Sequence, residues 1–162
     1  MRIGVISDTH DNLPAIERAV TFFNTQKISF VLHAGDYVAP FAAARLASLS
    51  CGWRGVLGNN DGEKDGLIRI SEGRITEGIL RVEIGDRKIA VVHDLGSLDL
   101  EKEKARIIVC GHTHKPELAA RNSRLIVNPG EACGWLSGVS TVAIVDLESL
   151  SAKIHTLERS KR

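Results

Sequence analysis

Short apolar runs alternate with segments of helical spacing in the first third of the chain. The runs at residues 3–7, 30–33 and 56–57 each end in polar residues or a turn, and they predict three strands. Pro14 and Pro40 each open a stretch in which apolar residues recur at the spacing of a helix. These residues are Ile16, Ala19, Val20 and Phe23 in the first stretch and Phe41, Ala44 and Leu46 in the second. The alternation of strands and helices predicts a parallel sheet with right-handed crossover connections.

Beyond Gly78 the pattern becomes that of β-structure. Leu80, Val82 and Ile84 alternate with charged residues, and an apolar run at 89–92 follows the turn at 85–86, which predicts a hairpin. Four more apolar runs predict strands at 107–110, 125–127, 139–145 and 152–157, and residues 98–105 predict one short helix. Because the chain contains no repeat, low-complexity tract or linker, we expect a single domain over residues 1–162.

Composition and charge exclude several classes of function. With 162 residues, 43% of them hydrophobic and 25% charged, the chain is typical of one globular domain. A net charge of +1 gives no broad basic surface, so we expect no nucleic-acid binding. No apolar run nears the roughly 20 residues that span a bilayer, and we expect neither a signal peptide nor membrane binding. The spacing of Cys51, Cys110 and Cys133 argues against a thiolate zinc site and favours the reducing cytoplasm, and we expect Cys110 in the core.

Asp, His and Asn residues recur where the predicted strands end. They are Asp8 and His10 after the first strand, Asp36 after the second, Asn59 after the third, His93 after the hairpin, and His112 and His114 after residues 107–110. Ligands of open α/β sheets bind beyond the carboxyl ends of the strands, so we expect these seven side chains to converge. Oxygen and imidazole donors without thiolates favour divalent manganese, iron, cobalt, nickel or zinc. Each short motif alone is an ordinary loop sequence, but the ordered set predicts a metal cage.

The same motifs resemble those of the calcineurin-like metallophosphoesterase superfamily, in particular its small single-domain, YfcE-like phosphodiesterase branch. The resemblance covers nearly the whole chain, and its matching segments are residues 6–12, 33–36, 58–62, 111–114 and 128–131, followed by Gly134. It implies an α/β fold in which two mixed sheets pack face to face with helices outside, a four-layer α/β/β/α sandwich.

The resemblance also implies a metal pair that shares Asp36. One ion is held by Asp8, His10, Asp36 and His114, and the other by Asp36, Asn59, His93 and His112. We expect two divalent ions, manganese first, whose bridging hydroxide hydrolyses a small phosphodiester. The residues implied in catalysis are Asp36, Asn59, Asn60 and His112, and those implied in phosphate contact are Asn12 and Asn60. Hydrogen bonding within the loops is the alternative role of both Asn12 and Asn60.

Asn60 departs from the family pattern, because many members carry a histidine there that can protonate the leaving group. An amide cannot act as a general acid at neutral pH. The alternative function is a catalytically silent scaffold on the same fold, similar to the retromer subunit that resembles these enzymes. That protein departs at ligand positions, whereas this chain has all seven ligand types. We therefore expect a phosphodiesterase, and a homo-oligomer is compatible with the sequence.

Overall fold

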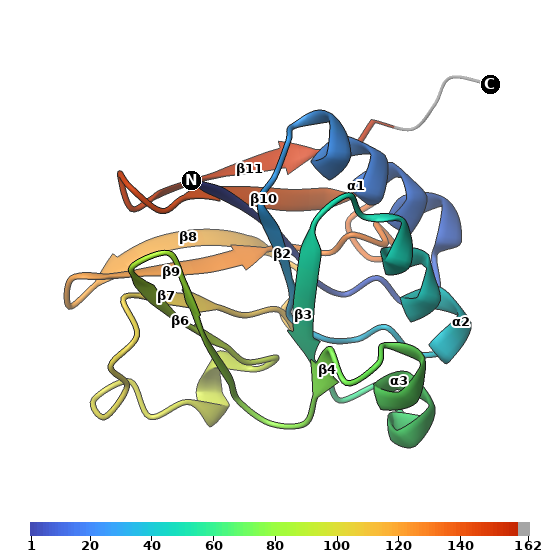
Figure 1. Cartoon of the computed structure of the whole chain (residues 1–162), viewed down its shortest axis with the longest axis horizontal. Coiled ribbons are helices and arrows are strands. Elements are labelled where there is room, and N and C mark those ends of the chain that lie inside the picture. The colour runs from blue at the N-terminus through green and yellow to red at the C-terminus, as the bar shows by residue number, and fades with distance from the viewer. Residues whose placement is uncertain (159–162) are drawn as a thin grey trace.

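Two sheets packed face to face form the centre of the molecule (Figure 1). The computed structural model describes residues 1–158, so the end of the predicted domain 1–162 lies outside the described residues. Sheet A contains, in spatial order, β11 (Ser151–Thr156), β10 (Thr141–Asp146), β1 (Arg2–Ile6), β2 (Phe30–His33), β3 (Gly52–Val56) and β4 (Ile75–Thr76). Sheet B contains β5 (Leu80–Ile84), β6 (Arg87–Val91), β7 (Ile107–Val109), β9 (Arg124–Pro129) and β8 (Pro116–Arg121). Both sheets mix parallel and antiparallel pairs, which confirms the expected α/β class.

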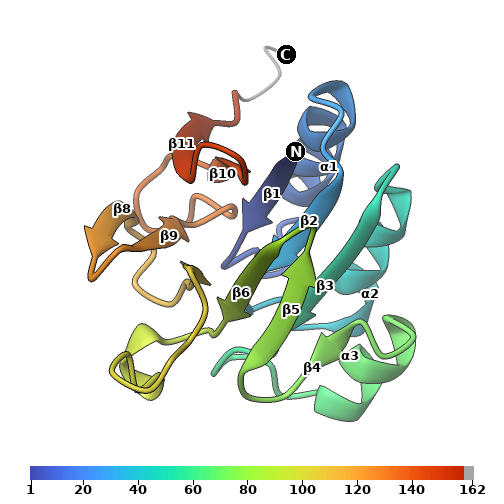
Figure 2. The same ribbon diagram turned by 60° about the vertical axis from the view of Figure 1, so that its left-hand side comes forward.

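Helices cover the outer face of sheet A. They are α1 (Leu13–Thr25), α2 (Pro40–Ala43), which continues as a 3₁₀ turn at Ala44–Ser48, and α3 (Lys64–Ile70) (Figure 2). The five residues Ala15, Ile16, Ala19, Val20 and Phe23 form the buried face of α1. Gly4 in β1 lies directly beneath Phe23, and a Cβ atom there would come within 2.7 Å of the ring. The glycine therefore lets α1 lie close against the sheet.

The strands of the two sheets are apolar on both faces where they pass through the centre. In β1, Ile3 and Val5 pack between the sheets, whereas Ile6 packs against the helices. In sheet B, Ile107 and Val109 face sheet A, and Ile108 faces outward into a third apolar cluster. Strands buried on both faces read as continuous apolar runs, which is why the sequence predicts them well.

The outer layer on sheet B is thin. A 3₁₀ turn at Leu95–Ser97 and an irregular segment cover this face with Leu98 and Ala105. The predicted helix at 98–105 is wrong. The carboxylate of Glu103 accepts the backbone N–H groups of Lys104 and Ala105, and this local bonding competes with helical hydrogen bonds.

Parallel pairing brings the carboxyl ends of several strands to one edge. In sheet A, β1, β2 and β3 run parallel, and in sheet B, β6, β7 and β9 run parallel. The loops that leave β1, β2, β3, β6 and β7 carry the seven predicted ligands. The face-to-face packing of the sheets places both sets of loops around one centre.

Candidate metal centre

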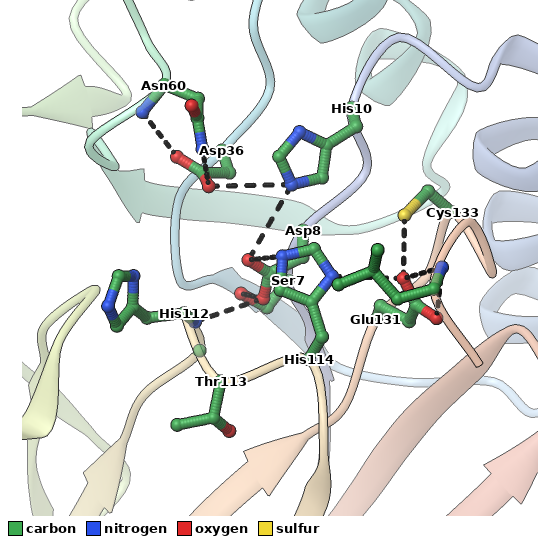
Figure 3. Close-up of polar contacts among 12 residues, drawn as sticks. Ser7, Asp8, His10, Asp36, Asn60, His112, Thr113, His114, Glu131 and Cys133 are labelled. Atoms are coloured by element: carbon green, nitrogen blue, oxygen red, sulfur yellow. Dashed lines mark hydrogen bonds and ion pairs between the residues drawn. The ribbon is translucent and has the colours of Figure 1, made fainter.

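All seven side chains that the sequence singles out come together, as expected. Figure 3 shows His10, His112 and His114, from loops far apart in the chain, around Asp8 and Asp36. Asn59 and His93 lie next to them, with Nε2 of His93 3.5 Å from Oδ2 of Asp36. Asp8 and Asp36 are fully buried, whereas His10 and His114 are partly accessible. A small molecule can therefore approach from the side of the histidines.

The first group of predicted ligand atoms is close together but only partly hydrogen-bonded. Asp8, His10, Asp36 and His114 each direct one donor atom into a space where these atoms lie within 4.8 Å of one another. Oδ2 of Asp8 accepts from the hydroxyl of Ser7 at 2.6 Å and the N–H of His112 at 3.2 Å. Oδ1 of Asp8 and Nε2 of His10 are buried without a partner among the described residues. Buried polar atoms of this kind are rare unless an ordered water or an ion satisfies them.

The second group joins the first at Asp36. Nε2 of His93 lies 2.8 Å from Oδ1 of Asn59, and Nδ1 of His112 lies 2.9 Å from the same oxygen. His93 donates its Nδ1 hydrogen to the carbonyl of Ala34 at 2.7 Å, so the neutral ring presents a lone pair to Asn59. Oδ2 of Asp36 lies 3.5 Å from Nε2 of both His10 and His93. Two adjoining sets of lone pairs that share one carboxylate fit a pair of divalent cations.

Backbone strain accompanies these ligands. Five of them have positive φ angles, between 40° and 68°: Asp8, His10, Asp36, His112 and His114. Non-glycine residues in this region cost on the order of 1–3 kcal/mol each and persist only where surrounding contacts impose them. Here the backbone N–H groups of Asp8 and His10 donate to the carbonyls of Gly35 and Asp36. A Cβ atom at Gly58 would collide with the Asp36 carboxylate, so that loop requires glycine.

Asp61 and Asn128 brace the ligand loops, and the sequence alone does not reveal these roles. The buried Asp61 carboxylate accepts the N–H groups of Asp36, Val38 and Gly58, which ties the loop after β2 to the loop after β3. Asn128 donates to the carbonyl of Gly111 at 2.8 Å and holds the loop that carries His112 and His114. Their positions inside the matching motifs are the only sequence signal.

Glu131 contacts a predicted ligand directly. Its carboxylate is fully buried, and it accepts from Nδ1 of His114 at 2.9 Å. Burial acts to raise the pKa of this carboxyl, but hydrogen bonds from His114, Ser137 and the N–H of Leu136 outweigh it and hold the pKa at about 2. With its Nδ1 hydrogen engaged, His114 presents the Nε2 lone pair 3.5 Å from Oδ1 of Asp8.

Asn60 and Asn12 have different surroundings. The Asn60 side chain donates to Oδ2 of Asp36 at 2.7 Å and its backbone N–H donates to Oδ1, so it reaches the shared carboxylate. Asn12 is the N-cap residue of α1: its side-chain oxygen accepts from the N–H of Ala15, and its amide donates to the carbonyl of Cys133 at 2.7 Å. Loop hydrogen bonding thus engages both polar atoms of Asn12, and its contact with phosphate stays a prediction.

Comparisons with known proteins agree with this geometry. The profile of the calcineurin-like phosphoesterase superfamily domain matches residues 1–150. A phosphodiesterase of Methanocaldococcus jannaschii is 34% identical over 166 residues, which cover 98% of this chain and 100% of that protein. The solved structure of an archaeal phosphodiesterase has a TM-score of 0.90 at 33% identity and covers 97% of this chain and 100% of its own.

Two more distant structures share the fold alone. The YfcE phosphoesterase of E. coli has a TM-score of 0.74 at 20% identity, covering 98% of this chain and 100% of its own. Vps29 from Entamoeba histolytica, solved with zinc, has a TM-score of 0.72 at 22% identity, covering 99% and 95% of the two chains. The fold therefore occurs in proteins with different names and roles, and function has to be argued from the centre itself.

Proposed function

Because the chain belongs to the calcineurin-like phosphoesterase superfamily, we propose that it is a two-metal phosphodiesterase acting on small phosphodiesters. The observation that carries the proposal is the pair of adjoining lone-pair clusters that share the Asp36 carboxylate. The alignment with the Methanocaldococcus jannaschii relative, which is named a phosphodiesterase, covers both chains almost completely and supports the same activity here.

The chain's own residues would hold and orient the metal pair. Asp8, His10 and His114 complete one site with Asp36, and Asn59, His93 and His112 complete the other. Two divalent ions in these sites supply Lewis acidity and a water whose pKa falls from about 15.7 toward 7. The Ala34 carbonyl and Glu131 fix the rings of His93 and His114, so the donor atoms are in place before a metal arrives.

Asn60 is proposed to contact the phosphoryl group. Its amide nitrogen lies 2.7 Å from Oδ2 of Asp36, which is the oxygen nearest to both histidine clusters. An amide N–H donates to an anionic oxygen but releases no proton at neutral pH. Asn60 therefore orients the substrate without protonating the oxygen that leaves.

Manganese and a cytoplasmic location complete the proposal. The donor set of carboxylate, amide and imidazole groups at the seven predicted ligands suits manganese. Cys51, Cys110 and Cys133 are free thiols, which is the usual state in a reducing compartment. Within residues 1–158, no helix combines the length and apolarity needed to cross a membrane.

A silent scaffold on the same fold is the alternative. A scaffold has no need of strained loops that aim buried donor atoms at one centre, two of which, Asp8 Oδ1 and His10 Nε2, have no hydrogen-bond partner among the described residues. The complete donor set of this chain therefore favours an enzyme.

The deciding experiment combines metal analysis with hydrolysis of bis(p-nitrophenyl) phosphate. We expect two manganese ions per chain and hydrolysis that disappears after chelation and returns with manganese. The monoester p-nitrophenyl phosphate, assayed in parallel, separates a diesterase from a monoesterase. A protein that binds two ions and hydrolyses neither ester would be a scaffold.

A further inference from the structure

The loop from Gly134 to Val139 presents apolar side chains to solvent. Trp135 is 63% exposed, Leu136 77% and Val139 45%. Burial of apolar side chains is favourable, so leaving three of them exposed on one loop costs free energy. Such a group of exposed apolar side chains is typical of a binding surface. The loop follows the last of the matching motifs, and the metal cage makes no use of it.

Three hydrogen bonds join this loop and the preceding Cys133 to the segment that carries Asp8, His10 and Asn12. The indole N–H of Trp135 donates to the carbonyl of His10 at 3.2 Å. The backbone N–H of Cys133 donates to the carbonyl of Asp8 at 3.1 Å, and the Cys133 carbonyl accepts from the side chain of Asn12 at 2.7 Å. Trp135 is therefore attached to the backbone of a predicted ligand.

The buried Glu131 carboxylate holds the loop in this position. It accepts the N–H groups of Leu136 and Ser137 and the hydroxyl of Ser137 at 2.7 Å, in addition to its bond with His114. The exposed apolar residues and a predicted ligand thus share one anchor. A surface that is already ordered loses little conformational freedom on binding.

The two sides of the centre differ in polarity. The side chains of Asn59, Asn60 and His112 are exposed around the second cluster of donor atoms. Trp135 adjoins the first cluster through His10, whose ring stacks on that of His114 with centroids 5.0 Å apart. The exposed apolar side chains of the loop thus lie on the side of the first cluster, and the exposed polar ones lie on the side of the second.

We propose that Trp135, flanked by Leu136, is a stacking platform for a planar aromatic group of the substrate, which makes nucleotidyl phosphodiesters the preferred class. This inference rests on the proposed phosphodiesterase function. The indole is 63% exposed while its N–H is engaged with the His10 carbonyl, and nucleobases stack readily on exposed aromatic rings. A net charge of only +1 gives little long-range attraction for an anionic nucleotide, so recognition depends on contacts at the site.

The first test compares two phosphates that differ only in the group they carry. Thymidine 5′-monophosphate and ethyl phosphate are measured as competitive inhibitors of the manganese-loaded enzyme, with methyl p-nitrophenyl phosphate as the reporter substrate. We expect the wild type to prefer the nucleotide and Trp135→Ala to reduce that preference by on the order of tenfold to a hundredfold. Trp135→Phe should keep most of the preference. Ile70→Ala, which removes another exposed apolar side chain at the end of α3, should keep all of it.

The second test uses tryptophan emission and needs no turnover. Trp135 is exposed whereas Trp53 is only 6% exposed, so a nucleotide that stacks on Trp135 quenches the solvent-exposed emission in wild type and leaves Trp135→Phe unchanged. Quenching by the nucleotide in a protein that hydrolyses no ester would keep the platform and reject the phosphodiesterase. An unchanged inhibitor preference in Trp135→Ala together with no quenching would overturn the platform. The platform would also be overturned if Trp135→Ala changed only the self-association of the protein and left nucleotide binding intact.

Discussion

At the scale of single residues, the protein arranges its centre by occupying some atoms and leaving others free. Ser7 and the His112 N–H take one oxygen of Asp8, and the other oxygen has no partner among the described residues. His93 and His114 each have one nitrogen engaged, by the Ala34 carbonyl and by Glu131, which directs the second nitrogen to the centre. Supporting hydrogen bonds therefore decide which atoms can bind metal.

Glu131 provides a test of this arrangement. Glu131→Gln removes the negative charge that fixes the His114 ring, so we expect metal affinity at the site formed by Asp8, His10, Asp36 and His114 to fall about 10- to 100-fold. The other site should change little. Calorimetric titration with manganese measures both affinities, and anomalous scattering from soaked crystals shows which ion is lost. Equal weakening of both sites, or none, would contradict the role of Glu131, and Glu103→Gln is the control for loss of a buried carboxylate elsewhere.

Asn60 makes a prediction about leaving groups. Since its amide releases no proton, hydrolysis should be easy for nitrophenyl diesters and much slower for alkyl esters, whose oxygens leave poorly as anions. A positioned acid contributes about 10²- to 10⁴-fold, so Asn60→His should gain most on the poor leaving groups. The measurement is the slope of log rate against leaving-group pKa for both proteins, with Asn60→Ala as control. A wild-type slope near zero with rate-limiting chemistry would show that another group supplies the proton.

The seven clustered residues could be predicted from the sequence, whereas their supports could not. His93 stands directly after an apolar run and Asp36 follows one after a short turn, and strand order alone brings such positions together. Glu131 and Asp61 act through bonds to backbone groups or rings of other loops, so their roles depend on loop paths that no periodicity encodes. The sequence does not indicate a role for Trp135 for the same reason, because its exposure and its bond to His10 exist only in the folded chain.

At the scale of elements, prediction succeeds where a segment has a buried face. The strand β7 and the helix α1 each bury most of their apolar residues, and the sequence predicts both. The strand β8 is almost entirely exposed and α3 buries only Leu67, so neither shows an apolar pattern, and the sequence does not predict them. The error at 98–105 has a different cause, since Glu103 satisfies the local N–H groups outside a helix.

Glu103 should also make the outer layer of sheet B sensitive to acid. Burial acts to raise the pKa of this carboxyl, but the Ala105 N–H and the Arg81 guanidinium outweigh it and hold the pKa below its ordinary value of 4.5. A pKa lowered in the folded state means that the unfolded chain binds more protons, so this contribution to stability is present above pH 4.5 and is lost as the pH falls. We expect Glu103→Gln to cost about 1–3 kcal/mol at neutral pH and less below pH 4. Urea unfolding at several pH values measures the difference in the free energy of unfolding between the wild type and this variant. A difference that does not change with pH would contradict this account. Glu83→Gln, at an exposed position of β5, is the control.

At the scale of the whole molecule, the sequence predicts the parallel β1–β2–β3 unit and the β5–β6 hairpin from apolar patterns. The packing of two sheets face to face came from the family resemblance, because both faces of a central strand look alike in sequence. The thin layer over sheet B was not predicted, since the segment after His93 covers Ile108 with a few apolar side chains and no helix. The apolar pattern of the sequence thus predicts the strands of the sheets better than it predicts the segments that cover their outer faces.

The centre also links metal binding to the stability of the entire fold. Asp36 is a buried carboxylate whose Oδ2 lies 3.5 Å from Nε2 of His10 and of His93, so we expect its charge to destabilise the metal-free fold and a bound metal pair to offset that cost. Each manganese ion at about 100 times its dissociation constant should stabilise the protein by about 2.7 kcal/mol, which raises the melting temperature by roughly 5–10 °C per ion. Asp36→Asn should lose this shift while the metal-free variant melts at or above the temperature of the metal-free wild type, because a buried charge has been removed. Scanning calorimetry with chelator and with manganese measures both, and Glu83→Gln should behave as wild type. An Asp36→Asn protein that still gained the full shift would show that the two ions do not share this carboxylate, since each cluster would then be complete without it.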